Sequence, residues 1–136
     1  MSRPYIGGTS GAIKAVTAST DLEVADHGKT MVVDGSSAGN ITITLPATAS
    51  SKGVSYSIIL GAANNAATEV LVTSDTNIIG FLIDSDNGEA AYATSGASRG
   101  FADAAKAGSR MTILCDGSKW LIVDAMCDLA FITAFS

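Results

Sequence analysis

The sequence predicts an all-β fold, an antiparallel β-sandwich or a barrel-like domain built from short strands. Over 41–45 and again over 54–60, apolar residues occupy every second position, which is the side-chain repeat of a pleated sheet. Turn residues interrupt the chain about every ten residues, as in all-β domains. At most one short helix is expected, over 101–107 before Gly108, and this Ala-rich stretch could equally be a loop.

Each element follows from these signals. Strands are expected at about 22–25, 29–34, 40–46, 53–60, 68–73, 77–83, 89–94, 109–115 and 119–124, with an apolar tail at 128–135. Asn87-Gly88 and Asp116-Gly117 predict two hairpin turns, because these residues tolerate positive φ. Pro46 lacks the N–H group of a ladder hydrogen bond and so ends a strand. No internal repeat at a solenoid period is visible in the sequence.

The predicted domain organisation is an N-terminal arm, 1–20, followed by a single β domain, 21–136, that ends in an apolar C-terminal strand or tail. A chain of 136 residues has the length of one domain and can bury a core of its own. Proline and glycine at positions 4, 7, 8 and 11 leave little regular structure at the start of the arm. Because Tyr5 and Ile6 are apolar, we expect them to lie on the domain itself or on a neighbouring molecule.

Composition excludes several classes of partner. Acidic residues outnumber basic ones 13 to 8, giving a net charge of −5 without a basic cluster, so no nucleic acid is expected to bind. The apolar stretch over 120–135 is interrupted by Asp124 and Asp128 and cannot span a bilayer. The first residues lack the apolar core of a signal peptide, so synthesis in a cytoplasm is expected.

Charged residues make up only 15% of the chain, against about 25% in a typical domain. A surface with so few charges fits an extracellular or virion protein, a protein that hides surface in an oligomer, or a small β domain rich in Ala and Ser.

Reactive side chains form no recognisable motif, so we expect no enzymatic activity, no cofactor and no metal. His27 is the single histidine and lies in a predicted turn. Cys115 and Cys127 cannot complete a zinc site without further ligands, and a disulfide between them is disfavoured in a reducing compartment. The acidic run over 84–89 has the wrong spacing for a calcium loop, and the Gly-rich run over 7–14 lacks the Ser or Thr of a phosphate-binding loop.

The last predicted strand is apolar on both faces. Trp120 and Ile122 lie on one side and Leu121 and Val123 on the other. A strand of this kind must be covered on both sides, either within a sandwich or by a second subunit. The apolar residues that follow favour the second subunit, and the predicted interface comprises Leu121, Val123, Leu129, Phe131 and Phe135. Trp120 itself is more typical of a core residue than of a sugar-stacking one.

Several short motifs resemble those of β-rich modules in structural proteins of tailed bacteriophages. They are Ile-Thr-Leu-Pro (43–46), Ser-Ser-Lys-Gly (50–53), Tyr-Ser-Ile-Ile (56–59), Asp-Thr-Asn-Ile-Ile-Gly (75–80) and Cys-Asp-Gly-Ser-Lys-Trp (115–120). Such modules occur in capsid decoration (cement) proteins, head fibres and tail fibres. The resemblance covers about 30–124 and leaves the two ends of the chain unexplained.

The resemblance implies a virion protein on the outer capsid surface. The first interpretation is a capsid decoration protein that binds the major capsid protein as a homotrimer and stabilises the shell. In this interpretation Arg3, Tyr5 and Ile6 of the arm contact the capsid or a neighbouring subunit. The alternative is a receptor- or glycan-binding module of a head or tail fibre, for which Trp120 and Tyr92 are the aromatic candidates.

Overall fold

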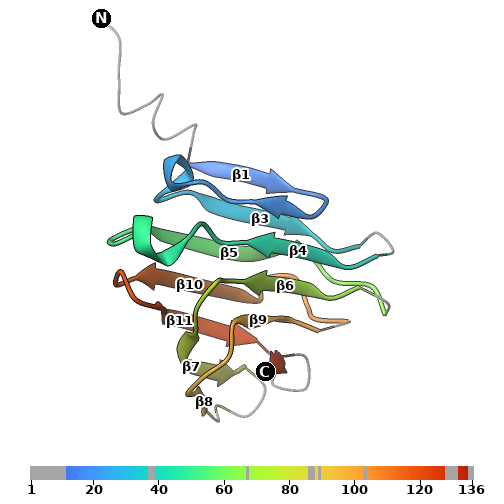
Figure 1. Cartoon of the computed structure of the whole chain (residues 1–136). Coiled ribbons are helices and arrows are strands. Elements are labelled where there is room, and N and C mark those ends of the chain that lie inside the picture. Colours follow the sequence, from blue (N-terminus) through green and yellow to red (C-terminus); the bar gives the residue numbers. More distant parts are fainter. Residues whose placement is uncertain are drawn as a thin grey trace, which may run out of the picture.

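In a computed structural model, the chain forms two β-sheets packed face to face (Figure 1). The structure describes residues 12–36, 39–66, 68–85, 88, 90–102, 104–127 and 132–134. The seven-stranded sheet contains, in spatial order, β1 (Ile13–Val16), β3 (Thr30–Asp34), β5 (Ser55–Ala62), β10 (Arg110–Cys115), β11 (Trp120–Cys127), β7 (Ile78–Asp84) and β8 (Ala90–Ala93). The five-stranded sheet contains β12 (Ile132–Ala134), β9 (Ser98–Phe101), β6 (Val70–Thr73), β4 (Ile41–Thr44) and β2 (Thr20–Asp21). The predicted all-β sandwich is confirmed, and the two sheets do not close into a barrel.

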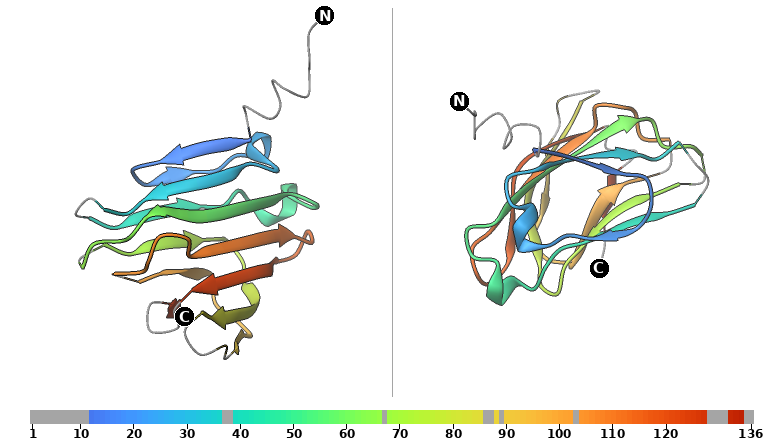
Figure 2. Two further views of the ribbon diagram at one scale, coloured as in Figure 1. Left: turned by 180° about the vertical axis from the view of Figure 1, so that it is seen from behind. Right: turned by 90° about the horizontal axis from the view of Figure 1, so that it is seen from above.

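The first six strands wind like the coils of a parallel β-helix. From β1 to β6 the chain crosses to the other sheet after every strand, so that β1, β3 and β5 lie side by side and parallel, as do β2, β4 and β6 (Figure 2). Val16, Val33 and Leu60 occupy matching positions in three successive coils, and all three are buried. Each coil therefore covers the apolar edge of the one before it.

The second half of the chain breaks this winding. The β10–β11 hairpin lies between β5 and β7, so that β10 runs antiparallel to β5 while β11 runs parallel to β7. Of the ten strand pairings among described residues, five are parallel and five antiparallel. The expectation of an antiparallel sandwich is therefore wrong for half of the pairings. A period of two identifies the side of a strand that faces the core, but it does not identify the neighbouring strand or its direction.

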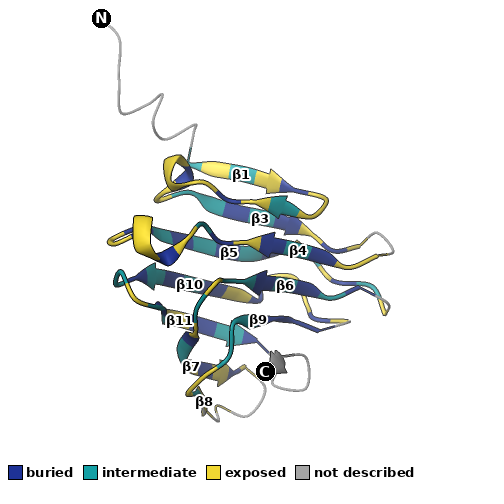
Figure 3. Cartoon of the chain, viewed as in Figure 1, coloured by how far each residue is buried: buried dark blue, intermediate teal, exposed yellow. Residues whose placement is uncertain are grey.

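The alternating stretch over 40–60 supplies one strand to each sheet. β4 and β5 lie in opposite sheets and are linked through a short 3₁₀ helix, η2 (Thr48–Ser50). The apolar residues predicted to face the core are buried, whereas the hydroxyl residues between them and Ile59 are half-buried or exposed (Figure 3). Tyr56 and Trp120 stack in the centre of this core with ring centroids 5.8 Å apart.

Several elements differ from the prediction. Residues 24–26 form a 3₁₀ helix, η1 (Val24–Asp26), where a strand was expected. β1 and the first residue of β2, Thr20, lie within the stretch predicted to be an arm, so among the described residues the sheets begin at residue 13. β9 was not expected, because 98–101 contains Arg99 and Gly100 in place of alternating apolar residues. β12 lies within 128–135, where an apolar strand or tail was expected.

The stretch over 101–107 forms turns and no helix among its described residues. Phe101 is the last residue of β9, and Ala104 has a φ of +61°, which an α-helix cannot accommodate. Ala105 is fully buried, and its carbonyl oxygen accepts a hydrogen bond from the backbone N–H of Asn64 at 2.9 Å. Packing against the β5–β6 connection therefore overrides the helical propensity of the alanines.

Candidate interaction surface

Large apolar side chains gather on the outer face of the seven-stranded sheet, over β11, β7 and β8. Phe81 is 61% exposed, Ile83 39%, Tyr92 55% and Val123 64%. Among the described residues, the other large apolar side chains exposed to this extent are Ile13, on the opposite edge of the sheet, and Val24, in η1. The apolar surface is therefore concentrated at one edge.

The sequence of β7 creates this surface because its two faces are both apolar. Ile78 and Leu82 point into the core, so Ile79, Phe81 and Ile83 point outward. The register of the β7–β8 hairpin places Tyr92 directly opposite Phe81. Their ring centroids lie 4.5 Å apart with an interplanar angle of 32°, a favourable aromatic cross-strand pair.

β11 extends the surface towards the middle of the sheet. Leu121 pairs with Ile79, and both side chains are half-buried. Ile113 pairs with Ile122 whereas Thr112 pairs with Asp124, so Val123 is the extra residue of a β-bulge and is pushed outward. We refer to these outward residues as the apolar face, which consists of Ile79, Phe81, Ile83, Tyr92, Leu121 and Val123.

The apolar face carries no charge at neutral pH, and a balanced ion pair lies beside it. Arg110 Nε and Asp124 Oδ2 are 3.2 Å apart, and both side chains are nearly half exposed. An exposed pair of this kind contributes little to stability. An apolar centre next to a polar margin is the usual anatomy of a protein–protein interface.

The structure places two of the predicted interface residues on the apolar face, namely Leu121 and Val123. Leu129, Phe131 and Phe135 lie outside the described residues, as do Arg3, Tyr5 and Ile6 of the arm. Phe81 and Ile83 were missed. The same signal that identified Leu121 and Val123, a strand apolar on both faces, is present in 78–83 and could have found them.

Trp120 and Tyr92, the two candidates for a sugar-binding platform, have opposite environments. Trp120 is fully buried, which confirms it as a core residue and removes it as a surface platform. Tyr92 is exposed and is paired with Phe81.

The buried carboxylate of Asp26, in η1, holds β1 and the residue before β3 together. It accepts hydrogen bonds from Lys14 Nζ and Lys29 Nζ at 3.1 Å each, and from the backbone N–H of Glu23 at 3.0 Å. Burial acts to raise the pKa of Asp26, but these hydrogen bonds outweigh it and lower the pKa to about 2.

Tyr56 connects η1 to β5, because its hydroxyl donates a hydrogen bond to the carbonyl oxygen of Glu23 at 2.6 Å. Burial is also the main reason why the pKa of Tyr56 is raised to about 12.

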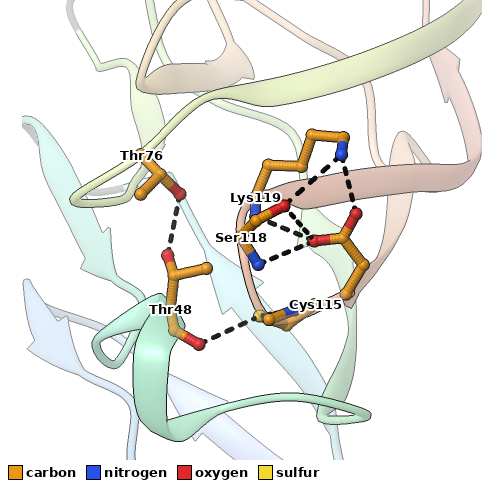
Figure 4. Close-up of polar contacts among 7 residues, drawn as sticks. Thr48, Thr76, Cys115, Ser118 and Lys119 are labelled. Atoms are coloured by element: carbon orange, nitrogen blue, oxygen red, sulfur yellow. Dashed lines mark hydrogen bonds and ion pairs between the residues drawn. The ribbon is translucent and has the colours of Figure 1, made fainter.

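A second polar cluster joins three connections (Figure 4). Thr48 Oγ1, in η2, donates to Asp75 Oδ1 at 2.5 Å and lies 2.7 Å from Thr76 Oγ1. The carbonyl oxygen of Thr48 accepts a weak hydrogen bond from Cys115 Sγ at 3.6 Å. In the adjoining β10–β11 turn, Lys119 Nζ donates to Asp116 at 2.8 Å and is the main cause of that carboxyl's lowered pKa. These contacts hold the loops in place.

The remaining reactive groups have structural surroundings. His27 is an exposed turn residue whose Nδ1 accepts the backbone N–H of Ser55 at 3.0 Å. Cys115 and Cys127 are buried thiols that form no disulfide. Within the described residues, no group of three or more His, Cys, Asp and Glu side chains is placed to hold a metal ion. None of the helices described is long and apolar enough to cross a membrane.

A small pocket of about 230 Å³ lies at the ends of β7 and β11. It is lined by Ser85, Lys106, Ala107, Gly108, Ser109, Met126 and Cys127. These described residues supply one ammonium group, two hydroxyl groups and two sulfur atoms, and include no carboxylate or imidazole. The apolar face is therefore the strongest candidate for a functional surface.

Comparison with known proteins gives no match: no protein-family model, curated protein or solved structure is similar to the chain at a significant level.

Proposed function

We propose that this chain is a structural protein of a tailed-phage virion, a capsid decoration (cement) protein that binds the outer capsid surface as a homotrimer and stabilises the shell. The observation that carries the proposal is the apolar face. Phe81, Tyr92 and Val123 are each more than half exposed and lie together on adjacent strands. Large exposed apolar patches with a polar margin mark interaction surfaces.

The motifs that resemble phage β modules support this proposal. In the fold, 43–46 ends β4 and 115–120 forms the β10–β11 turn, while 75–80 leads into β7, the strand that carries Phe81. The low charged fraction, 15%, is also consistent with a protein that buries part of its surface in an assembly. The net charge of −5 argues against a role in contacting packaged DNA.

The mechanism follows from mass action. A protein that binds only the assembled, expanded shell shifts the equilibrium towards that state and stabilises it against internal pressure. Joining three copies converts a weak contact of each subunit with the major capsid protein into tight attachment, because the second and third contacts are intramolecular. Arg3, Tyr5 and Ile6 are the proposed contact residues of the arm.

Quantitative mass spectrometry of purified virions tests this function. A decoration protein is expected in hundreds of copies for each particle. A handful of copies would contradict decoration and favour the fibre module, and absence from the particle would overturn both.

A second candidate function, a receptor- or glycan-binding module of a head or tail fibre, is favoured by one observation. The exposed Phe81–Tyr92 pair offers aromatic rings on which a sugar could stack. This function predicts that Tyr92→Ala abolishes binding to a glycan array without changing the oligomeric state. The decoration function predicts no glycan binding.

A further inference from the structure

We infer that the apolar face is the surface through which copies of this chain bind one another, with the Phe81–Tyr92 pair at the centre of the contact and close to the three-fold axis. The inference rests on the proposed homotrimer and adds the surface that forms it. Three features of the face identify a second copy as its occupant: its charge, its size and its position in the sheet.

The charge of the face permits contact between identical molecules. The whole chain carries a net charge of −5, so two copies repel each other over most of their surface. The apolar face is uncharged, and the neighbouring Arg110 and Asp124 balance each other. An identical face can therefore approach it without the repulsion between like charges that opposes other contacts.

The size of the face fits a subunit contact of moderate area. Its four exposed side chains offer on the order of 400 Å² of apolar surface, as much as the largest patch on a typical monomer. A stable interface takes about 800 Å² from each partner. The face therefore supplies the apolar centre, and the ion pair of Arg110 and Asp124 beside it supplies part of the polar margin.

The position of the face favours a three-fold arrangement. β8 is the edge strand of the seven-stranded sheet and β7 is its neighbour, so the aromatic pair lies at the edge. In the middle of the same outer surface, Ser57 Oγ on β5 and Thr112 Oγ1 on β10 lie 3.2 Å apart, beside the half-buried side chains of Ile59 and Leu114. Two sheets stacked face to face about a two-fold axis would bury these hydroxyl groups, whereas three edges that meet along one axis leave them in water.

A matched pair of variants tests the inference. Val123 and Ile13 are both 64% exposed on the outer surface of the same sheet, but Ile13 lies on β1, at the opposite edge. In sedimentation velocity, the wild-type protein is expected to be a trimer at micromolar concentration. Val123→Lys should raise the dissociation concentration at least ten-fold, and Ile13→Lys should leave it unchanged. Unchanged assembly of Val123→Lys, or equal loss in both variants, would overturn the inference.

A measurement on the wild-type protein removes any dependence on the folding of the variants. Tyr92 is 55% exposed in one chain, whereas Tyr56 is 1% exposed and serves as an internal control. Nitration by tetranitromethane, read by peptide mass spectrometry, should become slower at Tyr92 as the concentration rises through assembly. A rate at Tyr92 that does not depend on concentration would overturn the inference.

These results are separable from those that test decoration. A trimer with protected Tyr92 that is absent from virions would refute decoration and support the contact surface. Hundreds of copies on the virion with freely reactive Tyr92 would support decoration and refute the contact surface. A dimer with protected Tyr92 would refute the three-fold arrangement.

Discussion

Gly100, on β9, shows how closely two strands of the five-stranded sheet approach at a single residue. A Cβ atom at this position would lie 2.0 Å from the carbonyl oxygen of Val70 and 2.9 Å from the Cα atom of Leu71. Both atoms belong to the backbone of β6, so neither can move aside without breaking the ladder. Only glycine therefore fits between the two strands at this point.

Gly100→Ala is accordingly expected to lower the free energy of unfolding by at least about 2 kcal/mol. Gly28→Ala is the control, because Gly28 has a φ of +79° but no atom near the added methyl group. Its cost should be confined to the backbone conformation, about 1 kcal/mol. Urea denaturation followed by the fluorescence of buried Trp120 measures both values, and equal costs would contradict the close approach.

Asp26 predicts a dependence of stability on pH. Its folded pKa of about 2 lies below the ordinary value of 3.8, so the ionised form stabilises the fold. This stabilisation is fully present above about pH 4, is lost as the pH falls from 4 to 2, and amounts to about 2 kcal/mol. Asp26→Asn should therefore be less stable than wild type at pH 7 and nearly equal to it at pH 2.

The control for this prediction is Asp124→Asn, which removes an exposed ion pair. We expect it to change the free energy of unfolding by no more than about 0.5 kcal/mol at either pH. Chemical denaturation at the two pH values gives the comparison. A difference between wild type and Asp26→Asn that stays constant from pH 7 to pH 2 would contradict the role of Asp26.

At the scale of elements, the sequence predicts the strands that bury one face and misses those that do not. β5 and β10 are found to within two residues because their apolar and polar residues alternate. β9 was missed because Arg99 is only 3% exposed and Gly100 follows it, so its buried positions are not a run of apolar residues. β2 has two residues, too few to show a period.

The connection between β4 and β5 depends on Thr48. Its side chain is buried and donates to Asp75 at 2.5 Å, which links η2 to the β6–β7 loop. Thr48→Val keeps the shape but removes the donor, and we expect a loss of about 1–3 kcal/mol in unfolding free energy. Thr44→Val, at an exposed position of β4, should change it by less than about 0.5 kcal/mol. Thermal and urea denaturation that rank the two variants equally would contradict this assignment.

At the scale of the whole molecule, the order of the strands was not predictable from the sequence. Ile13, Thr30 and Ser57 lie at matching positions of three coils, yet they are separated by 17 and then 27 residues (30 − 13 and 57 − 30). Coils of unequal length leave no fixed repeat to detect. Insertion of the β10–β11 hairpin between β5 and β7 then depends on contacts between distant parts of the chain.

Only part of the apolar face was predictable from the sequence, because the sequence does not show which strands are neighbours. Leu121 and Val123 were found because 120–123 is apolar on both faces. Their proximity to Phe81 and Tyr92 depends on β11 lying beside β7, which alternation along one strand does not encode.

The arm provides a prediction about attachment to the shell. Deleting residues 2–11 removes Arg3, Tyr5 and Ile6 and leaves every described strand in place. Burial of one aromatic and one aliphatic side chain contributes roughly 1.5–3 kcal/mol each, and three arms add these contributions. The deletion should preserve folding and assembly but weaken co-sedimentation with undecorated capsids by orders of magnitude. If the protein lacking residues 2–11 decorates capsids equally at the same concentration, the contact with the capsid lies on the β domain instead of the arm.

A reconstruction of the virion by electron cryomicroscopy tests the central claim most directly. We predict three copies of the chain at three-fold or quasi-three-fold positions on the outer surface of the shell, with Phe81, Tyr92 and Val123 of each copy turned towards the axis. Density for the chain confined to a fibre or tail tip, or copies bound singly with the apolar face in solvent, would contradict it.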